Sequence, residues 1–218
     1  MELIYTILDW SEVWALLIPL VVLLKFKKQP GYLKPIIIYL WVALFIDLAI
    51  DIGFKYKHLN PYLIYPNNYL YNIHSILRFI LFSNFFIALK QPSLVTLKKV
   101  IPLIILFLAI LNFIFFEPFF SSVSFSSRLL ATEAGVLLFY CLQYYLFKLQ
   151  EEHVFQKTAD YWMVTALSIY VVFNFPFFLL YSSLEVKFQV FWWNIHNVSF
   201  IIFCIFIAKA FYVSRNRY

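Results

Sequence analysis

The chain has 218 residues, of which 64% are hydrophobic and 13% are charged, and its formal net charge is +6. Its mean hydropathy is +0.83, whereas soluble domains are nearer half apolar and a quarter charged. These values exclude a soluble globular domain and a disordered chain. The presence of only 3 glycines also excludes a glycine-rich nucleotide-binding loop as the organising feature.

Seven segments are long and apolar enough to cross a bilayer, which takes about 20 predominantly apolar residues in a helix. In chain order we expect these helices at about 10–26, 33–54, 69–89, 100–116, 129–147, 161–181 and 191–212. Short linkers with Pro, Asn, Ser and Lys separate them, as is typical of turns. The sequence therefore predicts an all-α integral membrane protein, with residues 1–218 forming a single seven-helix transmembrane domain.

The basic residues predict an orientation, because cytoplasmic loops carry an excess of Lys and Arg. One set of helix ends holds most of them: Lys25, Lys27, Lys28, Lys34, Lys90, Lys98, Lys99, Lys148, Lys157, Lys209, Arg215 and Arg217. The opposite set holds Lys55, Lys57, Arg128 and Lys187. We therefore expect the N-terminus outside and the C-terminus in the cytoplasm. The start, Met1-Glu2-Leu3, lacks the basic region of a cleavable signal peptide, so the first helix should be an uncleaved anchor.

The positive charge thus marks the cytoplasmic face, where lysines meet anionic lipid. We expect the lipid bilayer, and not nucleic acid, as the partner of these residues. The abundance of Phe, Tyr, Ile, Asn and Lys is typical of an AT-rich bacterial genome. Since the sequence encodes helices rather than barrel strands, the bacterial inner membrane is the expected location.

The sequence predicts an internal repeat of three helices, with a linker helix between the two copies. Matching positions lie 121 to 123 residues apart: Ser11-Glu12 with Thr132-Glu133, Asp51-Ile52-Gly53-Phe54 with Asn174-Phe175-Pro176-Phe177, and Asn72-Ile73-His74 with Asn194-Ile195-His196. The first repeat spans about 10–89, the linker helix about 100–116 and the second repeat about 129–212. Because a single linker helix adds one more crossing, the two copies of three helices would run in the same direction through the membrane.

This plan of three helices, a linker helix and three helices resembles that of the SWEET sugar transporters and the KDEL receptor. The seven-span sensor modules of bacterial histidine kinases resemble it in topology only. The resemblance implies parallel repeats around an axis along the membrane normal. It is a resemblance of architecture, and it assigns no functional residue.

Polar residues gather in the outer halves of six predicted helices, and such groups are costly inside a membrane unless they serve a site or each other. The candidates for a ligand- or ion-binding cavity are Glu12, Asp47, Asp51, Asn72, His74, Arg78, Glu133, Asn174, Asn194 and His196. Arg78 should neutralise Asp47 or Asp51, since an unpaired buried charge is too costly. The alternative is that these residues only satisfy helix ends and loops. Trp10, Trp14, Trp192 and Trp193 are expected to form an outer aromatic belt.

No catalytic motif stands out, so whether the chain is an enzyme stays open, with the balance toward a non-enzyme. The seven-span hydrolases related to alkaline ceramidase need three histidines with an aspartate. This chain has only His74 and His196 at a suitable depth, because His58 and His153 fall in loops. No compact metal-ligand spacing is present, so we expect no metal and no cofactor.

Three functions fit these features. The first is a receptor or accessory regulator that responds to a small ligand, an ion or pH in the outer cavity. Such a protein needs a separate effector partner, because only a few residues follow the last helix. The second is a transporter of a small solute or ion, which suits parallel repeats but lacks paired helix breaks. The third is an oligomeric pore or membrane effector.

Overall fold

The computed structural model describes residues 7–55, 68–91, 95–121, 125–150 and 158–215, and the regular structure in these ranges is helical. The long helices are α2 (Ser11–Lys25), α3 (Lys34–Lys55), α4 (Asn68–Ala88), α5 (Val95–Phe115), α6 (Ser127–Gln150), α7 (Ala159–Leu180) and α8 (Val186–Ser214). Short 3-10 turns, η1 (Gly31–Leu33) and η4 (Tyr181–Ser183), precede α3 and follow α7. Each predicted segment coincides with one long helix, with ends that differ by five residues at most.

In the described part of the chain, six helices are long and apolar enough to cross a membrane. These are α3 to α8, and the protein is accordingly a helical, multi-pass membrane protein in contact with lipid. Helix α2 is apolar as well but has 15 residues, which is about 22 Å of helix. The hydrocarbon core of a bilayer is about 30 Å thick. The helix ends where Lys27, Lys28 and Pro30 follow it, because proline cannot continue a helix.

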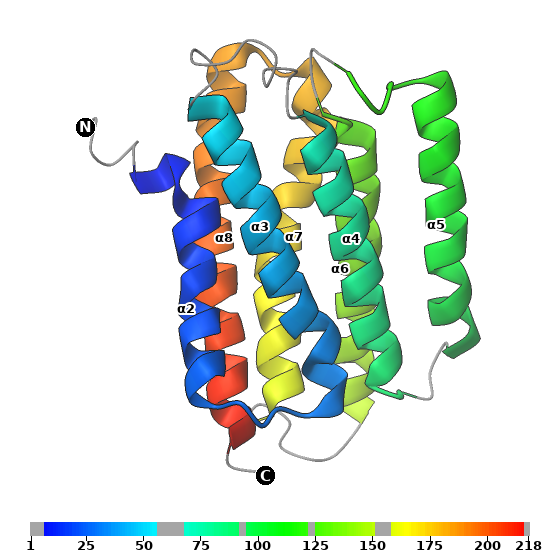
Figure 1. Ribbon diagram of the computed structural model, residues 1–218. Coiled ribbons are helices and arrows are strands. Elements are labelled where there is room, and N and C mark those ends of the chain that lie inside the picture. Colours follow the sequence, from blue (N-terminus) through cyan, green and yellow to red (C-terminus); the bar gives the residue numbers. More distant parts are fainter. Residues whose placement is uncertain (1–6, 56–67, 92–94, 122–124, 151–157, 216–218) are drawn as a thin grey trace.

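Helix α5 stands at one edge of the bundle (Figure 1). The other long helices form a closed ring, in which each packs against two neighbours of the ring. The order around the ring is α2, α3, α4, α6, α7 and α8, and α8 returns to α2. Helix α5 lies outside the ring against α4 and α6. Only 11% of its apolar stretch is buried inside the protein, compared with 33% to 56% of the apolar stretch in the other spanning helices. The surface of α5 therefore belongs mainly to lipid, whereas the ring encloses the core.

Aromatic side chains fill the middle of the ring. Tyr39 of α3, Phe82 of α4 and Phe203 of α8 are almost fully buried, and we call these three residues the aromatic plug. Their ring centroids lie 5.1 Å (Tyr39 to Phe82), 5.9 Å (Phe82 to Phe203) and 6.3 Å (Tyr39 to Phe203) apart. Such ring pairs add to the stability that area burial provides. The plug closes the interior with apolar surface.

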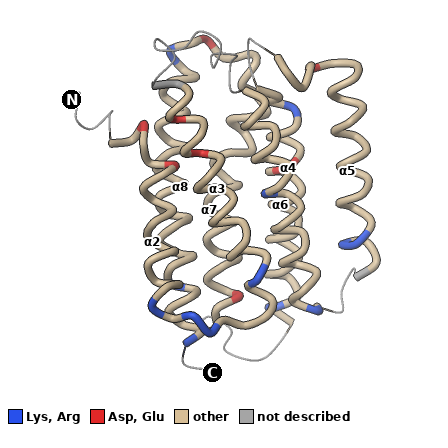
Figure 2. Tube along the Cα trace, viewed as in Figure 1, with Lys and Arg blue, Asp and Glu red and all other residues tan. Residues whose placement is uncertain are grey.

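The two ends of the bundle differ in charge (Figure 2). At the basic end, α2, α4, α6 and α8 finish and α3, α5 and α7 begin, with Lys25, Lys34, Lys98, Lys148 and Arg215 in their terminal turns. The opposite end, which we call the acidic end, contains Glu12, Asp47 and Glu133. Lys57, Lys157, Arg217, His58 and His153, which the sequence placed in loops or at the C-terminus, lie outside the described residues.

Candidate functional site

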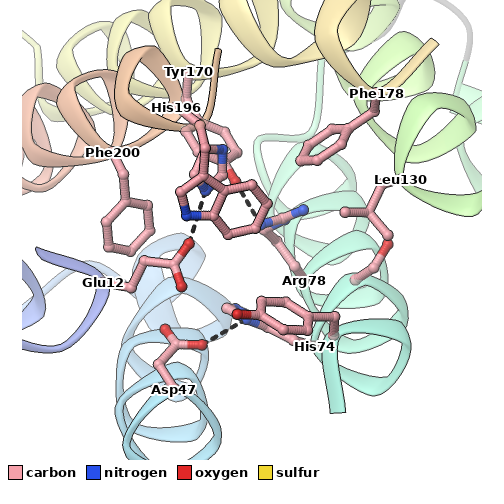
Figure 3. Close-up of a pocket in the computed structure, with 12 residues that line it drawn as sticks. Glu12, Asp47, His74, Arg78, Leu130, Tyr170, Phe178, His196 and Phe200 are labelled. Atoms are coloured by element: carbon pink, nitrogen blue, oxygen red, sulfur yellow. Dashed lines mark hydrogen bonds and ion pairs between the residues drawn. The ribbon is translucent and has the colours of Figure 1, made fainter. Parts of the chain in front are cut away.

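A small cavity of about 20 Å³ lies inside the ring at the acidic end (Figure 3). A space of this size is enough for one water molecule. Charged, polar and aromatic side chains line it: Glu12, Asp47, Tyr71, His74, Ser75, Arg78, Leu130, Tyr170, Phe178, Trp193, His196 and Phe200. Every helix of the ring contributes at least one of these residues, so the site depends on the assembled bundle.

Arg78 and Glu133 join α4 to α6 beside this cavity. The guanidinium donates from Nε to Oε1 at 2.5 Å and from Nη2 to Oε2 at 2.8 Å. Its Nη1 also donates to the hydroxyl of Tyr170 at 2.7 Å, and the Ser75 hydroxyl donates to Glu133 Oε2 at 2.5 Å. Both charged side chains are buried, with 8% and 2% of their surface exposed. The cost of burying the two charges is offset because they neutralise each other through a bidentate contact.

His196 links three helices at the same level. Its Nε2 lies 2.8 Å from Glu12 Oε1 on α2, and its Nδ1 lies 2.5 Å from Asn174 Oδ1 on α7. The amide nitrogen of Asn174 donates to the Tyr170 carbonyl at 2.6 Å and to the Ser199 hydroxyl at 3.2 Å. Each ring nitrogen of His196 therefore faces an oxygen atom.

Asp47 and His74 form the third charged group of the site, across α3 and α4. Asp47 Oδ1 lies 2.9 Å from His74 Nδ1, and the His74 ring stacks on Tyr39 of the plug with centroids 5.8 Å apart. Asp47 is 1% exposed. Among the described residues, Asp47 Oδ2 and His74 Nε2 are buried without a hydrogen-bond partner. Unpartnered buried polar atoms of this kind are uncommon and often mark a functional position.

Seven of the ten candidate residues come together in this region: Glu12, Asp47, His74, Arg78, Glu133, Asn174 and His196. Asp51, one turn from Asp47 on α3, is half-buried and does not line the cavity. Asn72 on α4 is buried but does not line the cavity. Its side chain binds the connection between α5 and α6, through the Phe119 carbonyl and the Ser126 amide. Asn194 is half-buried and also does not line the cavity.

The expected partners of Arg78 were wrong, and Trp193 has a contact beyond the expected outer belt. Arg78 pairs with Glu133 and not with Asp47 or Asp51, because ring packing brings α6 against the face of α4 that carries Arg78. Trp193 does not only belong to an outer belt, because it lines the cavity and lies 5.2 Å from the His196 ring. It precedes His196 by three residues, which places both on one face of α8.

Sequence reasoning missed several polar members of the site. Ser75 and Tyr170 both bond the Arg78–Glu133 pair, and Ser199 supports Asn174. Helical spacing carried a signal for each of them. Tyr170 precedes Asn174 by four residues, Ser75 precedes Arg78 by three, and Ser199 follows His196 by three, so each shares a helix face with one of the ten candidates.

The donor set does not suggest a metal centre. Among the described residues, no group of three or more His, Cys, Asp or Glu side chains lies close enough to hold a metal ion. In comparisons with protein families, with curated proteins and with solved structures, nothing matches this chain. The interpretation of the site therefore depends on its own geometry.

Proposed function

We propose that the chain is a membrane receptor or accessory regulator that responds to a small cation or to pH at its acidic end. The observation that carries the proposal is the composition of the cavity. The half-buried Glu12 and the buried Asp47 line the cavity, and the buried Glu133 lies beside it, with one guanidinium, Arg78, among these three carboxylates. The excess negative charge favours a cation or protons over an anion, because uncompensated buried charge is costly.

The proposal includes seven spans, with the acidic end outside the cell and the basic end in the cytoplasm. Helix α2 occupies a full place in the ring between α3 and α8, and residues 7–9 add a helical turn before it. The lysines and arginines at the basic end favour this orientation. The site would then face the outside of a bacterial inner membrane.

The internal repeat is also part of the proposal, and the ring order supports it. A two-fold exchange of α2 with α6, α3 with α7 and α4 with α8 leaves the order of neighbours in the ring unchanged. The histidine contacts agree with this exchange in the helices they join, although Asn174 aligns with Asp51 and not with Asp47. His74 on α4 faces Asp47 on α3, and His196 on α8 faces Asn174 on α7.

The filled interior favours a receptor over a pore. The aromatic plug lies between the site and the basic end, so apolar rings separate the charged groups of the site from that end. A receptor needs only a change of contacts among helices, which a separate effector at the basic end would detect. The two-fold ring order, however, favours a transporter of a small cation as the second candidate.

Thermal unfolding in nanodiscs tests the proposal. A panel of ammonium, sodium, potassium, calcium and magnesium salts and of buffers at different pH is expected to raise the Tm of the wild-type protein under at least one condition. Asp47→Asn should remove that shift while the variant still folds. Asp160→Asn is the matched control, because Asp160 lies at the basic end beside Tyr144. A panel without any shift would contradict the proposal.

Liposomes separate the two candidates. Protein reconstituted in liposomes should not move the cation that raises the Tm, if the chain is a receptor. Uptake that stops in Asp47→Asn would instead establish the transporter.

A further inference from the structure

His196 is surrounded by hydrogen-bond acceptors, and counting its protons leads to a specific ligand. The orientation of the Asn174 amide is fixed, because its Nδ2 lies 2.6 Å from the Tyr170 carbonyl, which can only accept. The other amide atom, Oδ1, must therefore be the one that faces His196 Nδ1 at 2.5 Å. With the amide reversed, two oxygen acceptors would meet at 2.6 Å.

It follows that His196 Nδ1 carries a proton, which it donates to Asn174. A neutral imidazole has one N–H, so its Nε2 would then carry a lone pair only. That lone pair would point at Glu12 Oε1 from 2.8 Å. An ionised carboxylate also offers only lone pairs, and the two groups would repel. A second proton must lie between Nε2 and Oε1, on either atom.

We propose that the Glu12–His196 pair is a proton-binding site, and that the proton is the ligand to which the receptor responds. The role as a signal rests on the function proposed above, whereas the binding of the proton rests on the bond count alone. Release is a simple transfer. The N–H or O–H bond between the pair breaks, the proton goes to water, and an ionised Glu12 and a neutral His196 remain.

The neighbouring charges set the conditions for this proton. Arg78 on α4 and Glu133 on α6 neutralise each other, and the Tyr170 hydroxyl on α7 accepts from Arg78. Asp47 on α3 faces the same cavity with an oxygen that lacks a hydrogen-bond partner among the described residues.

His74 and the remaining titratable groups do not need this second proton. His74 has an acceptor, Asp47 Oδ1, near one of its ring nitrogens, Nδ1, at 2.9 Å. Tyr71 borders the cavity as a neutral phenol. Asp51 is half-buried and Asp9 is exposed, and neither lines the cavity.

The proton holds α2 against α8 at the acidic end. A bond from Asn197 Nδ2 to the Leu8 carbonyl, at 3.1 Å, supports the same contact. At the basic end, Gln29 binds the Phe211 carbonyl at 3.4 Å and the Ser214 hydroxyl. Loss of the proton would therefore loosen α2 from α8 at the acidic end while the basic end stays attached.

Nitrogen-15 NMR of histidine side chains measures the proton directly. In the wild-type protein in nanodiscs, at neutral pH, His196 is expected to show two protonated ring nitrogens, or one protonated nitrogen together with an infrared band of protonated Glu12. An unprotonated His196 Nε2 beside an ionised Glu12 carboxylate would overturn the proposal, whatever the result of the cation panel.

Glu12→Gln provides the second measurement. Its amide can donate to a neutral His196 Nε2, so the contact persists without a labile proton. The Tm of the wild-type protein should fall as the pH rises from about 5 to about 8 and beyond, and this fall should be absent in Glu12→Gln. Asp160→Asn, at the basic end beside Tyr144, is the matched control and should retain it. An equal fall in Glu12→Gln and wild type would contradict the assignment.

The proton site and the receptor function fail in different ways. If NMR finds the second proton but the α2–α8 contact does not change with pH, the proton is structural and the signalling role is wrong. Hydrogen exchange of the first turn of α2, measured against pH, shows that difference. Exchange that speeds up at high pH supports the signalling role.

Discussion

Arg78 and Glu133 form a two-bond fork between α4 and α6, with distances of 2.5 Å and 2.8 Å. Both groups are buried, and the two helices belong to the two halves of the proposed repeat. The fork therefore joins the halves through a charge pair that neither helix can satisfy alone. Such a pair contributes little more to the stability of the fold than a well-packed apolar pair would. Loss of one partner, however, is strongly destabilising.

Arg78→Met should lower the free energy of unfolding by about 3 kcal/mol, because it leaves the Glu133 carboxylate buried without its cation. Unfolding in mixed micelles with increasing denaturing detergent measures the change. In the double variant Arg78→Met/Glu133→Leu the loss should be smaller than the sum of the two single losses. Additive losses would show that the two side chains do not depend on each other.

Gly135→Ala should destabilise the contact between α6 and α7 by about 1 kcal/mol, a typical cost of overpacking. A Cβ atom at this position would lie 3.0 Å from Cε2 of the Phe175 ring. Gly31→Ala is the matched control, because a Cβ atom there meets nothing within 4 Å. Thermal unfolding should separate the two variants, and adding Phe175→Leu to Gly135→Ala should restore the Tm.

Phe203→Ala should remove part of the aromatic plug and cost about 3 kcal/mol or more, as large-to-small changes do in a closed core. Phe203 is fully buried, whereas Phe107 on α5 is 60% exposed. Phe107→Ala should therefore change the free energy of unfolding little. Equal effects of the two substitutions would mean that the plug is not the packed centre of the ring.

Asn72→Ala should destabilise the protein by about 2 kcal/mol, because it leaves the Phe119 carbonyl and the Ser126 amide without this partner. Asn194→Ala, at the matching position of the proposed repeat, should cost much less since Asn194 is half-buried. Both variants should keep the Tm response to the site's ligand. A lost response in Asn72→Ala would bring Asn72 into the binding site.

Cysteine labelling checks the orientation and the crossing of α2. Single cysteines in place of Asp9, Lys28 and Lys187, all exposed, should react differently with a membrane-impermeant thiol reagent in intact cells. Asp9→Cys and Lys187→Cys should be labelled, and Lys28→Cys only after the membrane is opened. The native cysteines, Cys141 and Cys204, are buried. Labelling of Asp9→Cys and Lys28→Cys from the same side would show that α2 does not cross.

The helices were predictable because the membrane imposes a length and a composition on each of them. All seven predicted segments coincide with helices, although α5 and α8 begin five residues earlier than expected. These two helices extend into polar flanks at Thr96 and Lys187, where hydropathy falls while the helix continues. Hydropathy therefore locates a span better than it locates the end of its helix.

Depth along each helix was also readable from the sequence, because helix rise is constant. It placed Glu12, Asp47, Arg78 and His196 in the outer halves of their helices, and the structure brings them to one cavity. Depth did not identify which of these side chains bind one another. Arg78 had several carboxylates at its level, and one-dimensional spacing does not distinguish among them.

The sequence by itself determined a helical membrane protein with polar residues at one end, since burial of apolar side chains in lipid needs no partner helix. Only the tertiary structure decided the partners, because the ring order brings together residues such as Glu12 and His196 that are 184 positions apart. The proton count at His196 depends on those contacts. It follows from which oxygen atoms face the two ring nitrogens, and that is set by the packing of α2 and α7 against α8.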